Sequence, residues 1–139
     1  MKVANNINNL KESLTEIENA IKAGLETKQR TIGFHTSAAC VDMLEIYLHK
    51  LNLLSDDYLI KHEWLASKNK ISEKLGFEFR GKGELLKLIK EVEIKRNNFC
   101  YGKKKSFNEL SQLIEDFNKV KHKFEELGAD LKEETNGEQ

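Results

Sequence analysis

Apolar residues recur along most of this chain at helical spacing, in five segments separated by polar or glycine-containing breaks. The first stripe lies within residues 5–28, and its members are three or four positions apart: Ile7, Leu10, Leu14, Ile17, Ile21 and Leu25. Steps of three and four place side chains on one face of an α-helix, so the spacing predicts an amphipathic helix. No stretch of any length shows the alternation of apolar and polar residues that marks a half-buried strand.

The second predicted helix covers residues 35–54, and its stripe is more apolar and less one-sided than the first. A helix that is apolar on most sides is expected in the middle of the structure. Thr36 or Ser37 is expected to cap its start, because a hydroxyl can accept a hydrogen bond from the free amides of the first turn.

Three further helices follow from the same spacing. The third is predicted after a polar break at residues 55–57 and ends near Gly76, because glycine readily adopts the left-handed conformation of a helix stop. The fourth is predicted from residue 84 to about residue 101. The fifth begins after a capping serine, Ser106, and ends near Gly128.

Five amphipathic helices joined by short connections must bury their stripes against one another. The economical arrangement is an antiparallel up-and-down bundle, so the predicted fold class is all-α with about five helices. Residues 1–128 are predicted to form one domain. Residues 129–139 are polar and mostly acidic, and we expect them to be a disordered tail.

Composition narrows the class of protein. The chain has 23 Lys or Arg and 23 Asp or Glu, so its formal charge is zero and no strong overall attraction to nucleic acid or membrane is implied. No apolar run approaches the roughly 20 residues that cross a bilayer, and the start lacks a secretory signal, so we expect a cytoplasmic protein.

Cys40 and Cys100 are then expected to be reduced. The histidines lack metal-ligand spacing, so neither a metal nor another cofactor is predicted.

The fourth predicted helix carries the candidate chemistry. Its apolar stripe runs through Ile89 and Val92, and the next two positions on it are Arg96 and Phe99. An arginine on a core stripe keeps its charge, so it must be paired or must face a cleft.

Two interpretations of Arg96 follow. In the first, the guanidinium binds an anion such as a phosphate or a scissile phosphodiester. In the second, it forms an ion pair within the chain, with Glu93 or with a carboxylate of another helix. The adjacent Asn97 favours the first, because asparagine is a mediocre helix former and its side chain offers hydrogen bonds.

Other candidates surround Arg96 in the sequence. Tyr101 can donate a hydrogen bond to an anion or take part in proton transfer, or can simply pack its ring. His35 is a candidate distant partner of Arg96, with a capping or surface role as the alternative.

Residues 80–105 hold nine Lys or Arg against three Glu. From this region the phosphate-binding candidates, besides Arg96, are Lys95, Lys103, Lys104 and Lys105. The lysines after the helix can instead complement its C-terminal partial charge.

The order of the helices and the Arg96-Asn97 pair resemble the HEPN superfamily (higher eukaryotes and prokaryotes nucleotide-binding). The helix pattern covers residues 5 to about 127, and the sequence-specific part covers residues 92–103. The superfamily signature is an arginine, usually a polar residue next, and a histidine after four to six intervening positions. Here Arg96 and Asn97 match the signature. Tyr101 follows after four intervening positions, and no histidine follows after four, five or six.

Members of the superfamily are helical bundles, commonly dimeric. Many are metal-independent ribonucleases, toxins among them, and others are inactive partners or binding modules. The resemblance therefore implies a homodimeric RNA- or nucleotide-binding module with a degenerate ribonuclease site at Arg96, Asn97 and Tyr101.

The resemblance leaves two alternatives. The first is an active metal-independent ribonuclease or toxin that uses Arg96 with Tyr101 or His35. The second is a structural dimer scaffold for a nucleotidyltransferase-type partner. Because a tyrosine with an ordinary pKa near ~10 is a poor base at pH 7, the sequence leaves enzymatic activity open.

Overall fold

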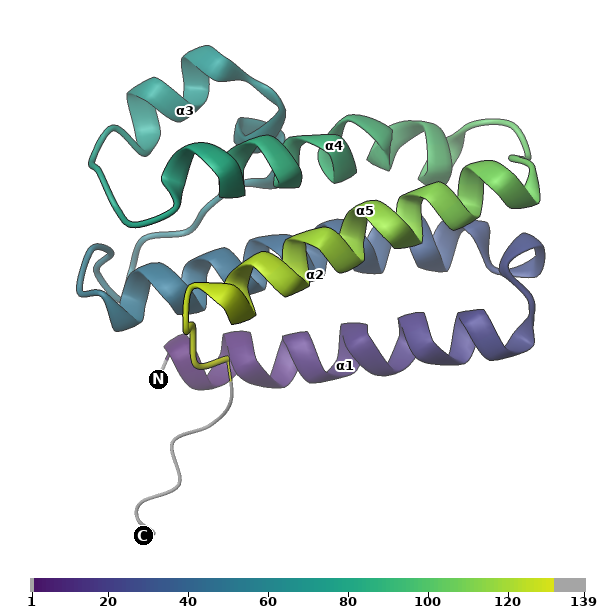
Figure 1. Cartoon of the computed structure of the whole chain (residues 1–139), viewed down its shortest axis with the longest axis horizontal. Helices are drawn as coiled ribbons and strands as arrows, with labels where there is room; N and C mark the ends of the chain where they lie inside the picture. The colour runs from purple at the N-terminus through teal and green to yellow at the C-terminus, as the bar shows by residue number, and fades with distance from the viewer. Residues whose placement is uncertain (1, 132–139) are drawn as a thin grey trace, which may run out of the picture.

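The computed structural model describes residues 2–131, which contain five α-helices, two short 3₁₀-helices and no β-strand. The elements are α1 (Lys2–Ala23), η1 (Leu25–Thr27), α2 (Gln29–Lys50), η2 (His62–Ala66), α3 (Lys68–Lys74), α4 (Lys82–Tyr101) and α5 (Phe107–Glu126). The prediction of an all-α bundle of about five helices is confirmed (Figure 1).

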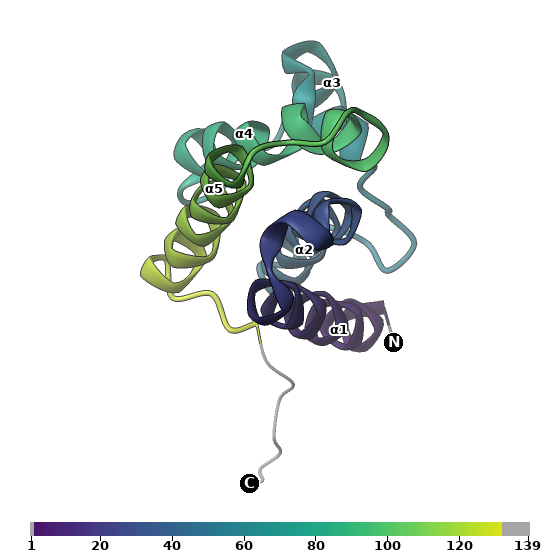
Figure 2. The same ribbon diagram turned by 90° about the vertical axis from the view of Figure 1, so that its right-hand side faces the viewer.

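The four long helices, α1, α2, α4 and α5, lie alongside one another, and successive ones run in opposite directions (Figure 1). α2 contacts the other three, and the end-on view shows it enclosed by them (Figure 2). The expectation that the second helix is central is therefore correct. Its most buried apolar side chains are Ile32, Ala39, Cys40, Met43, Leu44, Ile46 and Leu48.

The start of α2 differs from the prediction. The helix begins at Gln29, six residues early, so Thr36 and Ser37 lie inside it and do not cap it. Because interior amides are already paired within the helix, these hydroxyls bind elsewhere. Thr36 donates to the carbonyl oxygen of Ile32 at 2.7 Å, and Ser37 donates to the carboxylate of Glu93 on α4.

The predicted third helix is correct in where it ends and wrong in where it begins. The chain is irregular from residue 51 to residue 61, and α3 is a short helix capped by Ser67 that ends before Gly76. Long-range contacts hold this segment in place of helical hydrogen bonds. The amide of Ile60 donates to the carboxylate of Glu45 at 2.6 Å, and the hydroxyl of Tyr58 donates to a backbone carbonyl at the end of α3 at 2.7 Å. Gly76 does not adopt the left-handed conformation predicted for it.

The start of α5 agrees with the prediction. Ser106 accepts a hydrogen bond from the amide of Glu109, and the Glu109 carboxylate accepts one from the amide of Ser106, which is a capping box. Gly128 follows the helix with a φ of 75°, a conformation that favours glycine.

The tail prediction is corrected at residues 129–131. Ala129 donates to the carbonyl oxygen of Phe124 at 2.9 Å, and both Ala129 and Leu131 pack against the core. Lys50 donates to the backbone oxygen of Asp130 at 2.6 Å. The chain is therefore tied to the bundle as far as Leu131, and positions 132–139 of the predicted tail lie outside the described residues.

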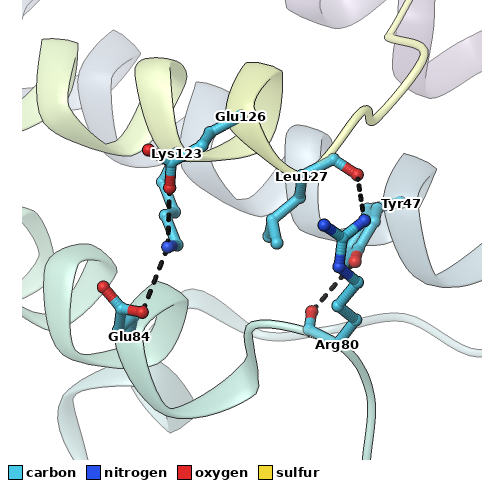
Figure 3. A network of polar contacts seen from close by, with 6 residues as sticks. All are labelled: Tyr47, Arg80, Glu84, Lys123, Glu126 and Leu127. Carbon is cyan, nitrogen blue, oxygen red and sulfur yellow. Dashed lines mark hydrogen bonds and ion pairs between the residues drawn. The ribbon is translucent and has the colours of Figure 1, made fainter.

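The end of α5 is fastened to the segment that precedes α4 (Figure 3). The Arg80 guanidinium donates to the carbonyl oxygen of Leu127 at 3.2 Å, and the Tyr47 hydroxyl donates to the carbonyl oxygen of Arg80 at 2.9 Å. The ammonium of Lys123 donates to Glu84 at 3.1 Å and to Glu126 at 2.8 Å. Arg80, one of the nine basic residues counted above, therefore holds the fold together.

Gly33 allows α4 to approach α2 closely. A Cβ at this position would lie 2.8 Å from the Cβ of Phe99 and 3.2 Å from the Sγ of Cys100. Overpacking costs about 1–3 kcal/mol, and the better helix propensity of alanine returns about 1 kcal/mol. We therefore expect Gly33→Ala to lower the free energy of unfolding by up to about 2 kcal/mol in urea denaturation. Gly83→Ala is the matched control, because nothing lies within 4 Å of its added Cβ. Equal effects of the two changes would contradict the close contact.

Candidate functional site

Arg96 lines a surface groove of about 300 Å³ between α2, α4 and the segment that leads into η2. We call it the Arg96 groove. Its lining residues are Phe34, Ser37, Ala38, Val41 and Asp42 from α2, Ile60, Lys61, His62 and Glu63 from the connecting segment and η2, and Arg96 from α4. Residues far apart in the sequence therefore meet at this groove.

The helical turn of α4 sets the position of Arg96. Ile89, Val92 and Phe99 are buried, and the same spacing brings the partly buried Arg96 to the edge of their stripe. Its guanidinium donates to the side chain of Asn97 at 3.3 Å and lies 5.9 Å from the ring centroid of Phe34. Within the described chain it forms no ion pair with a carboxylate. The guanidinium thus lines the groove instead of closing an ion pair with Glu93.

Glu93 lies one turn before Arg96, and only 1% of its side chain is exposed. One carboxylate oxygen, Oε2, accepts a hydrogen bond from the Ser37 hydroxyl at 2.5 Å, and the other, Oε1, lies 3.4 Å from Nδ1 of His62. Burial raises the pKa of Glu93 to about 7, although the Ser37 hydrogen bond and the Arg96 charge both oppose this rise. Glu93 therefore holds a proton near neutral pH far more readily than an ordinary carboxylate does.

His62 brings an imidazole into the same groove. Its Nδ1 faces Glu93, and its Nε2 lies 3.5 Å from the exposed carboxylate of Glu63. Burial is the main cause that lowers the pKa of His62, and the charge of Arg96 lowers it further, while Glu63 raises it. The neutral imidazole, which can accept a proton, is therefore the main form at pH 7.

Sequence reasoning missed His62 because its proximity to Arg96 has no local signal. The superfamily signature counts positions forward from the arginine, whereas His62 precedes Arg96 and comes from a different element. Only the packing of η2 against α4 brings the two side chains together. The presence of His62 next to Glu63 and Trp64, in a segment predicted to be regular helix, gave no indication of this role.

The predicted proton-transfer residues lie elsewhere. Tyr101 is largely exposed, and the guanidinium of Arg30 lies 5.9 Å from the centroid of its ring. His35 faces α1, with its Nδ1 3.0 Å from the hydroxyl oxygen of Ser13. Neither Tyr101 nor His35 lines the Arg96 groove, and Asn97 contacts it only through its hydrogen bond with Arg96.

The predicted phosphate-binding lysines differ in their surroundings. Lys95 forms an ion pair with Asp116 on α5, so its charge already has a partner. Lys103 and Lys104 are exposed. Lys105 is partly buried, with its ammonium 5.8 Å from the ring centroid of Phe99. The loop that carries these three lysines is therefore basic at its surface.

Cys40 and Cys100 are buried and free, and burial raises the pKa of both thiols. Among residues 2–131, no group of three or more His, Cys, Asp or Glu side chains is arranged to hold a metal ion. No helix in that part of the chain is both long and apolar enough to cross a membrane.

The fold and the groove together define an all-α bundle in which an arginine and a histidine line one surface cavity, with the buried carboxylate of Glu93 behind the histidine. The chain matches no protein-family model, no curated protein and no solved structure.

Proposed function

We propose that the Arg96 groove binds a phosphate group of RNA or of a nucleotide. The proposal is supported by one observation. The Arg96 guanidinium lines the groove, and within the described part of the chain it forms no ion pair. Its planar fork matches two phosphate oxygens. Lys61 also lines the groove and adds a second positive charge, while Asp42 and Glu63 contribute carboxylates to the same lining. Glu93 opposes an anion only in the molecules in which it is ionised.

Arg96→Ala tests this proposal. Hydrogen bonds to charged groups contribute about 1.5–3 kcal/mol, so we expect binding to weaken about tenfold to a hundredfold. The measurement is fluorescence anisotropy of a labelled RNA oligonucleotide, with adenosine monophosphate as a competitor. Lys90→Ala is the matched control, because it removes one positive charge from an exposed position of the same helix. If both variants lost the same affinity, general charge and not the groove would account for binding.

A second candidate function is cleavage of RNA by its own 2′-hydroxyl, and the position of His62 favours it. Neutral Nε2 can take the proton of the 2′-hydroxyl, whose oxygen then bonds to the adjacent phosphorus. The bond from phosphorus to the 5′ oxygen breaks, and that oxygen takes a proton from water. Arg96 stabilises the extra negative charge on the phosphorane. In this scheme His62 takes the place that the sequence assigned to Tyr101 or His35.

The test of the second function is incubation of the protein with RNA in the presence of EDTA. The expected products end in a 2′,3′-cyclic phosphate and a 5′-hydroxyl. DNA of the same sequence lacks the attacking hydroxyl and is expected to stay intact. Cleavage of both polymers would point to a contaminating nuclease and would contradict this chemistry.

The HEPN resemblance adds a proposal about assembly, namely a cytoplasmic homodimer. Exposed apolar side chains support an interface, since about half or more of Leu59 and Ile94 is exposed in the single chain. Sedimentation analysis measures the assembly state. The scaffold alternative, in which a nucleotidyltransferase-type partner binds the dimer, expects Arg96→Ala to dissociate the dimer without changing ligand binding.

A further inference from the structure

The surface along α2 and α4 carries two pairs of arginine and aromatic side chains. The guanidinium of Arg96 lies 5.9 Å from the ring centroid of Phe34, and that of Arg30 lies 5.9 Å from the ring centroid of Tyr101. In each pair one partner comes from α2 and the other from α4. Both pairs therefore bridge the line along which the two antiparallel helices meet.

The two pairs follow one another along this line. Arg30 and Phe34 are four residues apart on α2, so their side chains lie on the same face one turn from each other. α4 runs in the opposite direction to α2. Arg96, which comes before Tyr101 on α4, therefore lies beside Phe34, and Tyr101 lies farther along. The rings remain accessible, because 48% of Phe34 and 72% of Tyr101 is exposed.

A basic loop is fixed at the end of this line beyond Tyr101. The side chain of Gln29 donates to the carbonyl oxygens of Phe99 at 3.2 Å and Lys103 at 3.0 Å, and accepts from the amide of Lys105 at 2.7 Å. One glutamine at the start of α2 thus holds residues 102–105 against the helix. The exposed lysines of this loop extend the positive charge of the two arginines.

We propose that this line of α2 and α4 binds single-stranded RNA, with bases stacked on Phe34 and Tyr101 and phosphates held by Arg30 and Arg96. The proposal rests on the function proposed for the Arg96 groove and names the form of its ligand. An exposed ring beside a cation suits an unpaired base and its phosphate. A duplex hides the faces of its bases, so it cannot use the rings. Tyr101 acts here through its ring and not through its hydroxyl.

Tyr101→Ala tests the inference with a labelled 12-nucleotide single-stranded RNA and the same RNA as a duplex. Loss of one stacked base is expected to weaken single-strand binding about fivefold to a hundredfold, with a smaller change for the duplex. Tyr101→Phe keeps the ring and is expected to bind as the wild type does. Phe107→Ala is the matched control, because Phe107 is an exposed aromatic residue outside both pairs.

The outcomes separate this inference from the function it rests on. If adenosine monophosphate binds in an Arg96-dependent way but Tyr101→Ala binds single-stranded RNA as the wild type does, the stacking inference is wrong and the groove proposal stands. If Tyr101→Phe loses as much affinity as Tyr101→Ala, the hydroxyl and not the ring matters, and the inference is again wrong. If Tyr101→Ala changes only the assembly state, the ring belongs to a protein interface. If the wild type binds neither ligand, both proposals are wrong.

Discussion

In the cleavage mechanism proposed above, replacing His62 with alanine is expected to lower the rate of RNA cleavage by about 10²–10⁴-fold, the usual contribution of a positioned proton-transfer group. The reason is the geometry of the Arg96 groove. Nδ1 of His62 lies 3.4 Å from the buried carboxylate of Glu93, which orients the ring. Nε2 lies 3.5 Å from the exposed carboxylate of Glu63, which the substrate must displace to reach it. The measurement is the single-turnover rate in EDTA, so that substrate affinity and chemistry are separated.

The pH profile gives this prediction a second readout. Because burial and Arg96 lower the pKa of His62, its neutral form persists below the ordinary value of 6.5. The cleavage rate is therefore expected to fall only below pH 6.5 if the neutral imidazole alone limits it, and to fall near pH 7 if ionised Glu93 is required as well. His122→Ala is the control, since His122 is an exposed histidine on α5. Cleavage by His62→Ala at the wild-type rate would remove His62 from the mechanism.

The groove shows why the sequence predicts some features and not others. Helical periodicity depends on neighbouring residues, so the stripe Ile89, Val92 and Phe99 correctly placed Arg96 at the edge of the core. The cap at Ser106 is equally local and agrees with the prediction, and the structure adds the reciprocal bond from Glu109. Each of these features is determined by residues within one or two turns.

The segment between α2 and α3 depends instead on distant partners. The amide of Ile60 is bound to the carboxylate of Glu45, and His62 lies against Glu93 on α4. Such contacts leave no periodic signal, so the apolar residues of this segment were interpreted as a helix. The same long-range contacts bring His62 to the groove, which is why the sequence does not predict a histidine there.

The stability of the protein is expected to depend on pH through Glu93. The pKa of Glu93 rises from an ordinary 4.5 to about 7 on folding, so the folded chain holds this proton more tightly than the unfolded chain does. The resulting stability is fully present below pH 4.5 and is lost as the pH rises through 7. Ionised Glu93 thus costs about 3 kcal/mol at pH 8, at about 1.4 kcal/mol for each pH unit between the two values.

Glu93→Gln is expected to remove this cost, because glutamine has a similar shape and cannot ionise. Its free energy of unfolding should equal that of the wild type near pH 4.5 and exceed it by up to about 3 kcal/mol at pH 8. Urea denaturation at the two pH values measures the difference. Glu91→Gln is the matched control, because Glu91 is exposed on the same helix. If the free energy of unfolding changed with pH in the same way for the wild type and for Glu93→Gln, Glu93 would not be held in a buried state.

The same variant links stability to the groove. A buried carboxylate that destabilises the fold at neutral pH is expected where it serves a site, because perturbed groups concentrate there. If Glu93 orients His62, Glu93→Gln gains stability at pH 8 and loses cleavage rate. If Glu93 only opposes the phosphate, Glu93→Gln gains stability and binds RNA more tightly, with the rate unchanged. Measuring stability, affinity and rate on this one variant therefore decides between binding and catalysis at Arg96.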